Sequence, residues 1–185
     1  VHESTKSLLP AMASALRSWQ NNPDAMYVVG SVAGPSPYPR MVRTWASVIG
    51  RIAKQQFKQI TGKVPSTLFC VCGGGSNLMS MAYPLLKDKT EIFAVESAGE
   101  GIPTGRHGAT ILGGSKMGIL LGFKSKVVMK SAQIAESLTE ASGLDFAAVG
   151  PEVAYLHDIG RIKFRSTTDM EAKKTFLMCC KKLGI

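Results

Sequence analysis

Apolar residues in this sequence follow two spacings, and segments of the two kinds alternate along the chain. Residues 7–19 are predicted to form an opening helix, because apolar residues recur every three or four positions, at Leu8, Met12, Leu16 and Trp19. The same reasoning predicts further helices over residues 40–60, 76–86 and 168–184. Short runs of apolar residues predict strands over residues 26–29, 67–72, 91–96 and 162–166. Such an alternation predicts a layered α/β fold with a mainly parallel sheet.

Turn and capping residues mark where these elements begin and end. Three prolines between Gly34 and Pro39 exclude regular structure in that loop. Thr168 and Glu171 have the spacing of a capping box, and Gly184 is placed to end the last helix. Irregular, glycine-rich stretches are expected over residues 99–114 and 143–160.

Length and composition place the chain among ordinary globular domains. It has 185 residues, of which 45% are hydrophobic and 19% charged, enough for one domain with a real core. No apolar run approaches the roughly 20 residues of a membrane-spanning helix, so no membrane partner is expected. The first residues do not read as a signal peptide, although a longer parent chain could have carried a targeting sequence.

The cysteines and the net charge each suggest an alternative function. The four cysteines lack zinc-site spacing and are expected to be reduced, mostly buried thiols of an intracellular protein; a metal or redox site at Cys70 and Cys72 is the alternative. The formal net charge of +9 suggests a nucleic-acid partner. However, the basic residues are spread over several elements, without interleaved aromatic residues for base stacking. Solvated basic faces explain the charge better, so nucleic acid is an unlikely partner.

The segment with the clearest chemistry is the glycine loop that follows the strand at residues 67–72. Gly73, Gly74 and Gly75 lead directly into Ser76 and Asn77 at the start of a helix. Glycines allow close backbone approach, and a helix start leaves amide groups free, so the loop predicts an anion site that suits phosphate.

Other readings of this loop remain open. A dinucleotide fingerprint would need a third glycine where Leu78 stands, although Glu96 lies about where a ribose-binding acid would fall. A nucleotide-binding Walker loop would need a Gly-Lys-Ser/Thr ending, which the sequence lacks. A plain tight turn would need only one glycine.

Six blocks of sequence, in the same order, resemble those of tryptophan synthase β chains. They are residues 30–50 (with Gly-Ser-Val-Ala-Gly-Pro-Ser-Pro-Tyr-Pro), 73–77, 95–96, 105–110, 142–156 and 160–161. The resemblance runs essentially end to end. It implies a three-layer α/β fold of the pyridoxal-phosphate fold type II, incomplete here, with a mainly parallel sheet and helices on both faces. Residues 1–185 would be a single segment covering most of the larger, cofactor-phosphate-binding domain.

The resemblance also assigns roles around the cofactor, pyridoxal 5'-phosphate. The cofactor-binding residues that it implies are Gly73, Gly74, Gly75, Ser76, Asn77, Gly30, Ser31 and Gly143. Asp145 matches an aspartate that helps to close the site over the serine-derived intermediate. Main-chain carbonyls of Gly73, Phe146 and Ala148 would bind a monovalent cation. Arg17 matches a residue at the contact with the α subunit.

The activity implied is the joining of L-serine and indole to give L-tryptophan. The family holds its cofactor by a Schiff-base lysine in an upstream H-K-x-N block, which this sequence does not contain. The family's catalytic glutamate, in a final C-terminal region, also has no counterpart here. This segment is therefore expected to be inactive alone. Ser36, Ala147 and Val153 further replace the histidine, proline and histidine of the family pattern.

The same resemblance implies partners and a location, and alternative functions stand beside it. The α subunit and a second β chain are expected partners if the interfaces are retained, and serine and indole are substrates of the intact enzyme. The expected location is cytoplasmic, or a plastid if the parent gene is from a plant. A degenerate, non-catalytic copy acting as a subunit-binding or scaffold protein is the alternative. A nucleotide-binding domain that uses Glu96 is a third hypothesis.

Overall fold

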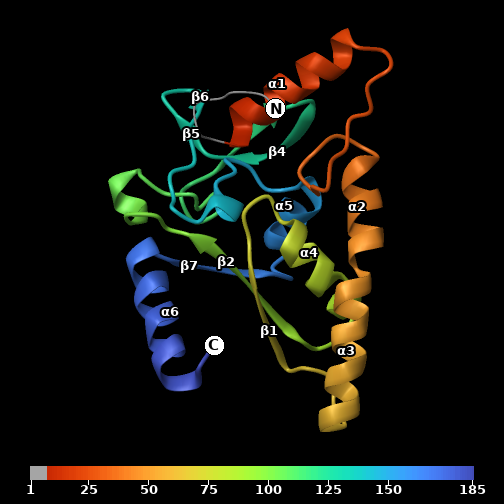
Figure 1. Ribbon diagram of the computed structural model, residues 1–185, viewed down its shortest axis with the longest axis vertical. Helices are drawn as coiled ribbons and strands as arrows, with labels where there is room; N and C mark the ends of the chain where they lie inside the picture. The colour runs from red at the N-terminus through yellow and green to blue at the C-terminus, as the bar shows by residue number, and fades with distance from the viewer. Residues whose placement is uncertain (1–7) are drawn as a thin grey trace.

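A parallel sheet lies at the centre of the computed structural model, which describes residues 8–185 (Figure 1). Its three strands are β1 (Thr67–Val71), β2 (Glu91–Ser97) and β7 (Lys163–Thr167), in the order β1-β2-β7. Both pairs of neighbouring strands run parallel. The expected α/β class with a parallel sheet and helices is therefore confirmed.

Helices and two hairpins surround this sheet. The helices are α1 (Leu8–Asn21), α2 (Tyr38–Ala46), α3 (Val48–Thr61), α4 (Ser76–Ala82), α5 (Pro151–Asp158) and α6 (Asp169–Leu183). The hairpins pair β3 (Lys116–Leu120) with β4 (Phe123–Val127) and β5 (Met129–Lys130) with β6 (Gln133–Ile134). Short 3₁₀ turns follow at η1 (Tyr83–Leu85), η2 (Ile102–Thr104) and η3 (Ser142–Leu144).

Two of the predicted helices are interrupted. The helix expected over residues 40–60 is divided at Ser47, whose buried hydroxyl donates to the Thr44 carbonyl and accepts from Arg51. A serine hydroxyl bonded to the preceding turn in this way competes with helical hydrogen bonds. The helix expected over residues 76–86 ends at Ala82, because Pro84 lacks an amide hydrogen and the chain tightens into η1.

Three other expectations about secondary structure are wrong. Residues 26–29 are irregular rather than a strand: Met26 and Val28 are 86% and 83% exposed, and no strand of the described chain lies beside them. Residues 143–160 are not wholly irregular, because they contain α5. The β3–β4 hairpin was not foreseen, because its basic residues and glycines obscure the alternation that indicates a strand.

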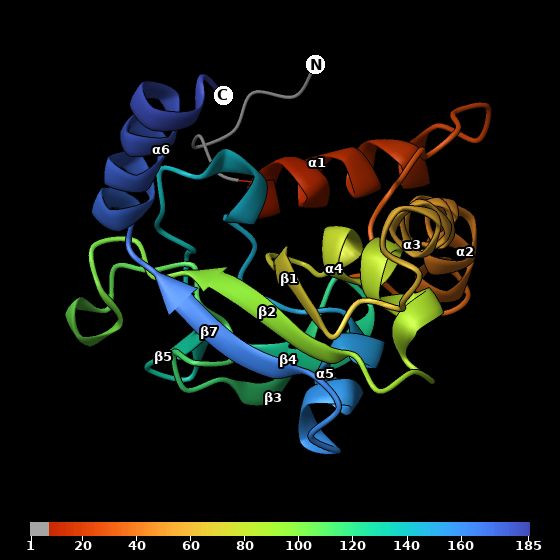
Figure 2. The same ribbon diagram turned by 90° about the horizontal axis from the view of Figure 1, so that it is seen from below.

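The last helix forms as its sequence indicates. The Thr168 hydroxyl accepts from the Glu171 amide, the Glu171 carboxylate accepts from the Thr168 amide, and Gly184 ends the helix in the left-handed conformation. Even so, no residue of α6 is buried, and the helix stands away from the sheet at the edge of the molecule (Figures 1 and 2).

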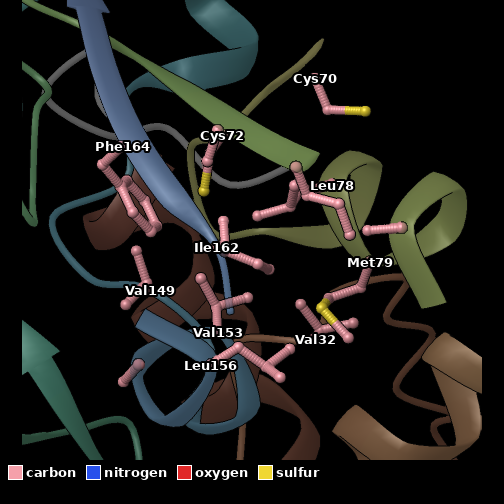
Figure 3. Close-up of a cluster of buried hydrophobic side chains, with 14 of the residues drawn as sticks. Val32, Cys70, Cys72, Leu78, Met79, Val149, Val153, Leu156, Ile162 and Phe164 are labelled. Carbon is pink, nitrogen blue, oxygen red and sulfur yellow. The ribbon is translucent and has the colours of Figure 1, made fainter. Parts of the chain in front are cut away.

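One face of the sheet carries the main hydrophobic core. In register across the strands, Cys70, Ala94 and Phe164 point to the same side, where α4 and α5 cover them. Leu78 of α4 and Val153 of α5 are fully buried against this face (Figure 3). The site-bearing loop between β1 and α4 is therefore anchored on both sides by packed elements.

The opposite face of the sheet is exposed. Phe69 and Phe93, which directly precede Cys70 and Ala94, point to this face. Their rings stack with centroids 5.0 Å apart, and Phe69 is 65% exposed. Lys163 and Arg165 lie over the Phe93 ring at 5.5 and 5.4 Å. Aromatic and basic residues thus meet on this face, although they are far apart in the sequence.

A single arginine links the start of β7 to the turn that precedes the neighbouring strand β2, at the same end of the sheet. The Arg161 guanidinium donates to the carbonyls of Leu85, Leu86, Asp88 and Thr90, at 2.9–3.2 Å. These carbonyls end η1 and form the turn before β2, so Arg161 replaces the hydrogen bonds that the turn cannot make itself.

Candidate functional site

The glycine loop lies at the carboxyl end of β1, between the sheet and α4. The amide of Gly150 donates to the Gly74 carbonyl at 2.9 Å, and the amide of Val32 donates to the Ser76 hydroxyl at 3.0 Å. The Asn77 side chain donates back to the Val71 carbonyl at 3.2 Å. The loop is therefore held by two segments that are distant in sequence and by one hydrogen bond of its own.

Two of the loop glycines are required by close packing. A Cβ on Gly73 would lie 3.0 Å from the Leu144 Cα, so the loop touches the 143–144 backbone. Gly75 has φ +104°, and a Cβ there would lie 2.6 Å from a methyl group of Val153. Any larger residue at Gly75 would be strained in backbone and side chain alike. A plain tight turn would not impose both constraints.

The loop leaves its amide groups unused. Among residues 8–185, no acceptor is bonded to the amides of Gly74, Gly75, Ser76 or Asn77. The first turn of a helix leaves its amides without partners inside the helix, so this set of free donors next to a cavity fits a bound anion. A dianionic phosphate, with several acceptor oxygens, suits such a cradle.

A cavity of about 800 Å³ opens in front of this loop. Its lining includes all eight residues named for cofactor binding, namely Gly73, Gly74, Gly75, Ser76, Asn77, Gly30, Ser31 and Gly143. The structure thus brings together residues from three separate parts of the sequence. A cavity of this size accommodates a phosphorylated ring compound.

Apolar residues that the sequence did not assign to cofactor binding also line this cavity. Leu8, Met12 and Ala15 come from one side of α1, and Phe146 comes from the loop before α5. The helical spacing of α1 indicated an apolar side, but only the fold shows that this side covers a cavity. Phe146 also contacts the back of the loop, where a Cβ on Gly74 would lie 3.5 Å from its ring.

Asp145 lies between two residues that line the cavity, Leu144 and Phe146, but does not line it itself. Its Oδ1 atom is buried and has no hydrogen-bond partner among the described residues. An unpaired buried carboxylate oxygen is costly, so the position favours a donor supplied from outside this segment. The role of Asp145 in closing the site stays a prediction.

The residues predicted for the cation site lie at the cavity or near it, and the residue predicted for the subunit contact lies on α1. Gly73 and Phe146 both line the cavity, and Ala148 is fully buried beside Val127. No cluster of His, Cys, Asp or Glu able to bind a metal is present among the described residues. Arg17 is exposed on α1, where a partner could reach it.

The dinucleotide reading is wrong for Glu96. Its side chain is 1% exposed, and its two carboxylate oxygens accept from the amides of Ile111 and Leu112 at 2.8 and 3.0 Å. Burial raises the pKa of Glu96 to about 7, against the opposing effect of these hydrogen bonds. Leu78, at the position of the missing third glycine, is fully buried in the core. Glu96 therefore organises the 110–112 turn and cannot reach a ribose.

The cysteines are free, as expected. Cys70 and Cys72 are buried, and burial raises the pKa of Cys70 to about 11 and that of Cys72 further. Metal binding and thiol redox chemistry need the thiolate, which these surroundings disfavour. Cys179 and Cys180 are half-buried on α6.

The fold and the loop define the class of protein: an α/β protein with a glycine-rich loop of free amides at the end of a parallel strand, consistent with the pyridoxal-phosphate enzymes of fold type II. No family model matches the chain. Similarity to individual proteins is nevertheless strong. The chain is 43% identical to a tryptophan synthase β chain from Methylobacterium nodulans, over all of its own length. It is 44% identical to the β chain of Methylobacterium radiotolerans and 42% identical to that of Pseudomonas syringae.

The chain is thus a homologue of tryptophan synthase β chains, as the six sequence blocks indicate. It spans less than half the length of the relatives that it matches, between 45% and 46% of each. These relatives are all named tryptophan synthase β chains. In the part of the chain that the structure describes, no helix is both long and apolar enough to cross a membrane.

Proposed function

We propose that this chain is the cofactor-phosphate-binding part of a pyridoxal-phosphate enzyme that makes L-tryptophan from L-serine and indole. The observation that carries this proposal is the set of free amides at Gly74 to Asn77, facing a cavity of about 800 Å³. The relatives are named tryptophan synthase β chains and match the whole of this chain. Residues 1–185 would make up most of the larger domain of that enzyme.

The residues present would hold the cofactor by its phosphate. The amides of Gly74, Gly75, Ser76 and Asn77 would donate to the phosphate oxygens, and Gly30, Ser31 and Gly143 would surround the rest of the molecule. Pyridoxal phosphate, when bound, supplies the electron sink that amino-acid chemistry at Cα and Cβ requires. The apolar side of α1 would keep water from that part of the cavity.

Three further roles belong to the same proposal. Asp145 would accept a hydrogen bond from a group that closes the site, because its Oδ1 atom is buried without a partner among the described residues. Main-chain carbonyls of Gly73, Phe146 and Ala148 would bind a monovalent cation. Arg17, exposed on α1, would contact an α subunit, and a second β chain would complete the assembly.

We propose that the 185 residues alone bind phosphate compounds without turnover. The sequence contains no H-K-x-N block to supply the lysine amine that covalent chemistry with the cofactor requires. A non-catalytic role as a subunit-binding protein is the second candidate, favoured by the exposed Arg17 on α1.

Calorimetric titration with pyridoxal phosphate and with pyridoxal, which lacks the phosphate, tests the cradle. We expect measurable binding of the phosphorylated compound only. Asn77→Asp, at an exposed position, should weaken it about tenfold or more, because the new charge repels the phosphate. Gln59→Glu, an exposed change of the same charge on α3, is the matched control. Equal binding of both compounds, or equal effects of both variants, would overturn the proposal.

The absence of turnover has its own assay. The purified chain is mixed with pyridoxal phosphate, L-serine and indole, and tryptophan is measured by chromatography. Tryptophan formed above the level of a protein-free control would refute the inactivity of this segment, whatever the titration shows. Retention on an immobilised α subunit, lost in Arg17→Ala, would instead support the subunit-binding role.

A further inference from the structure

Helices α2 and α3 form one continuous rod along the side of the molecule. They are separated only by Ser47, which keeps a helical backbone with φ −65° and ψ −6°. Figure 1 shows the two helices end to end, and Figure 2, along the rod, shows them superposed. The helical hydrogen bonding is interrupted at Ser47, but the two helices run in line from Tyr38 to Thr61.

Only one side of this rod packs against the protein. Val42 of α2 is buried, and Gly50 of α3 crosses α4 so closely that a Cβ would lie 2.6 Å from the Ser80 and Met81 carbonyls. Beyond Gly50, no residue of α3 is buried. The outer side of the rod thus has no cover among the residues that the structure describes.

That outer side carries a row of large apolar side chains. The row, called here the α2–α3 ridge, consists of Met41, Trp45, Ile49, Ile52 and Ile60. Trp45 is 65% exposed and Ile60 is 83% exposed. The row is spaced by three or four residues, with Gln56 filling the one gap. Single exposed apolar residues are ordinary, but a row along two helices marks an interaction surface.

The charged residues around the ridge indicate the kind of partner that it would bind. Residues 38–63 contain six basic residues and no acidic residue. Arg43 and Lys54 are already paired, with Glu152 and Asp88, at 2.5 Å each. The others, on exposed positions, are Arg40, Arg51, Lys58 and Lys63. Arg40, Arg51 and Lys58 follow one another at helical spacing beside the apolar row, so the ridge has a positive border.

We propose that the α2–α3 ridge docks an amphipathic helix of a partner protein whose apolar side is bordered by acidic residues. A narrow seam with a spacing of three to four residues matches the side of another helix better than a flat surface. A second copy of this chain would bring like charges together and is disfavoured. This surface is independent of the cofactor cavity.

The test uses the whole chain and two fluorescent 20-residue helical peptides, with the same leucine seam but glutamate or lysine borders. Fluorescence anisotropy should show at least tenfold tighter binding of the glutamate peptide, weakening as salt is added. Ile52→Glu and Lys58→Glu, both at exposed positions, should each reduce that binding at least fivefold. Ile119→Glu and Lys116→Glu, exposed changes on β3, are the matched controls and should have no effect.

Several results would overturn the proposal. Equal binding of the two peptides would show that acidic borders do not favour binding. An equal loss of binding in the β3 control variants would show that the peptide does not bind at the ridge. Sedimentation that shows a dimer broken by Ile52→Glu would assign the ridge to a second copy. Binding to anionic phosphatidylserine vesicles, lost in Ile52→Glu, with no binding of the glutamate peptide would assign it to a membrane surface.

Discussion

The two faces of the central sheet are built from the same three strands but have opposite surroundings. Cys70, Ala94 and Phe164 lie in register on one face and are buried under α4 and α5. Their immediate neighbours Phe69, Phe93 and Lys163 lie in register on the other face, where Phe69 is 65% exposed. The exposed face thus combines aromatic rings with basic residues.

The difference shows that a face contributes to stability when helices pack on it, whatever the residue types that it carries. The covered face supports the glycine loop, since Val153 and Val32 pack against the back of Gly75. The exposed face instead places Lys163 and Arg165 over an aromatic ring, an arrangement that keeps basic groups in water while their stems shield the ring. Stability and the site should therefore depend on the first face much more than on the second.

The largest effect is expected from a truncation in the covered face. Leu78 is fully buried between the sheet and α5 (Figure 3), so Leu78→Ala should lower the free energy of unfolding by about 2–5 kcal/mol. Urea denaturation followed by circular dichroism measures this. A loss below about 1 kcal/mol would mean that the covered face is loosely packed in solution.

An intermediate effect is expected from the buried carboxyl group on the same face. The pKa of Glu96 is about 7 in the folded protein, whereas the unfolded chain would ionise near the ordinary value of 4.5. Between these values the folded state binds more protons, so its stability falls as pH rises from about 4.5 to 7. The decrease should be on the order of 1–3 kcal/mol.

The comparison with Glu96→Gln isolates this contribution, because the amide does not titrate. Urea midpoints of both proteins at pH 5 and pH 7.5 give the difference. The native protein should lose stability relative to the variant as pH rises. An unchanged difference, or one of the opposite sign, would show that the hydrogen bonds from Ile111 and Leu112 outweigh burial.

The smallest effect is expected on the exposed face. Phe69→Ala removes a ring that is mostly in water and one stacking contact with Phe93, so unfolding should become easier by less than about 1 kcal/mol. The same urea experiment applies. A cost as large as that of Leu78→Ala would contradict the comparison and reveal that another chain covers this face in solution.

Local signals predicted the elements that depend only on near neighbours. The strands at residues 67–71 and 91–97 and the capped helix α6 lie where periodicity and capping residues indicated. The strand expected at residues 26–29 failed because a strand needs a neighbour, and no described segment provides one. The break at Ser47 escaped notice because it depends on a hydroxyl buried by tertiary packing.

The sequence by itself determined the glycine-rich loop before α4, because three glycines before a helix start are a local feature. The ordered blocks indicated the relatives. Only the tertiary structure decided what surrounds that loop. It brought Gly30, Ser31 and Gly143 to the cavity, added the apolar side of α1, and removed Glu96 from any ligand role by burying it. The physical reason is that cavities and burial arise from contacts between distant segments, whereas spacing along the chain records only local geometry.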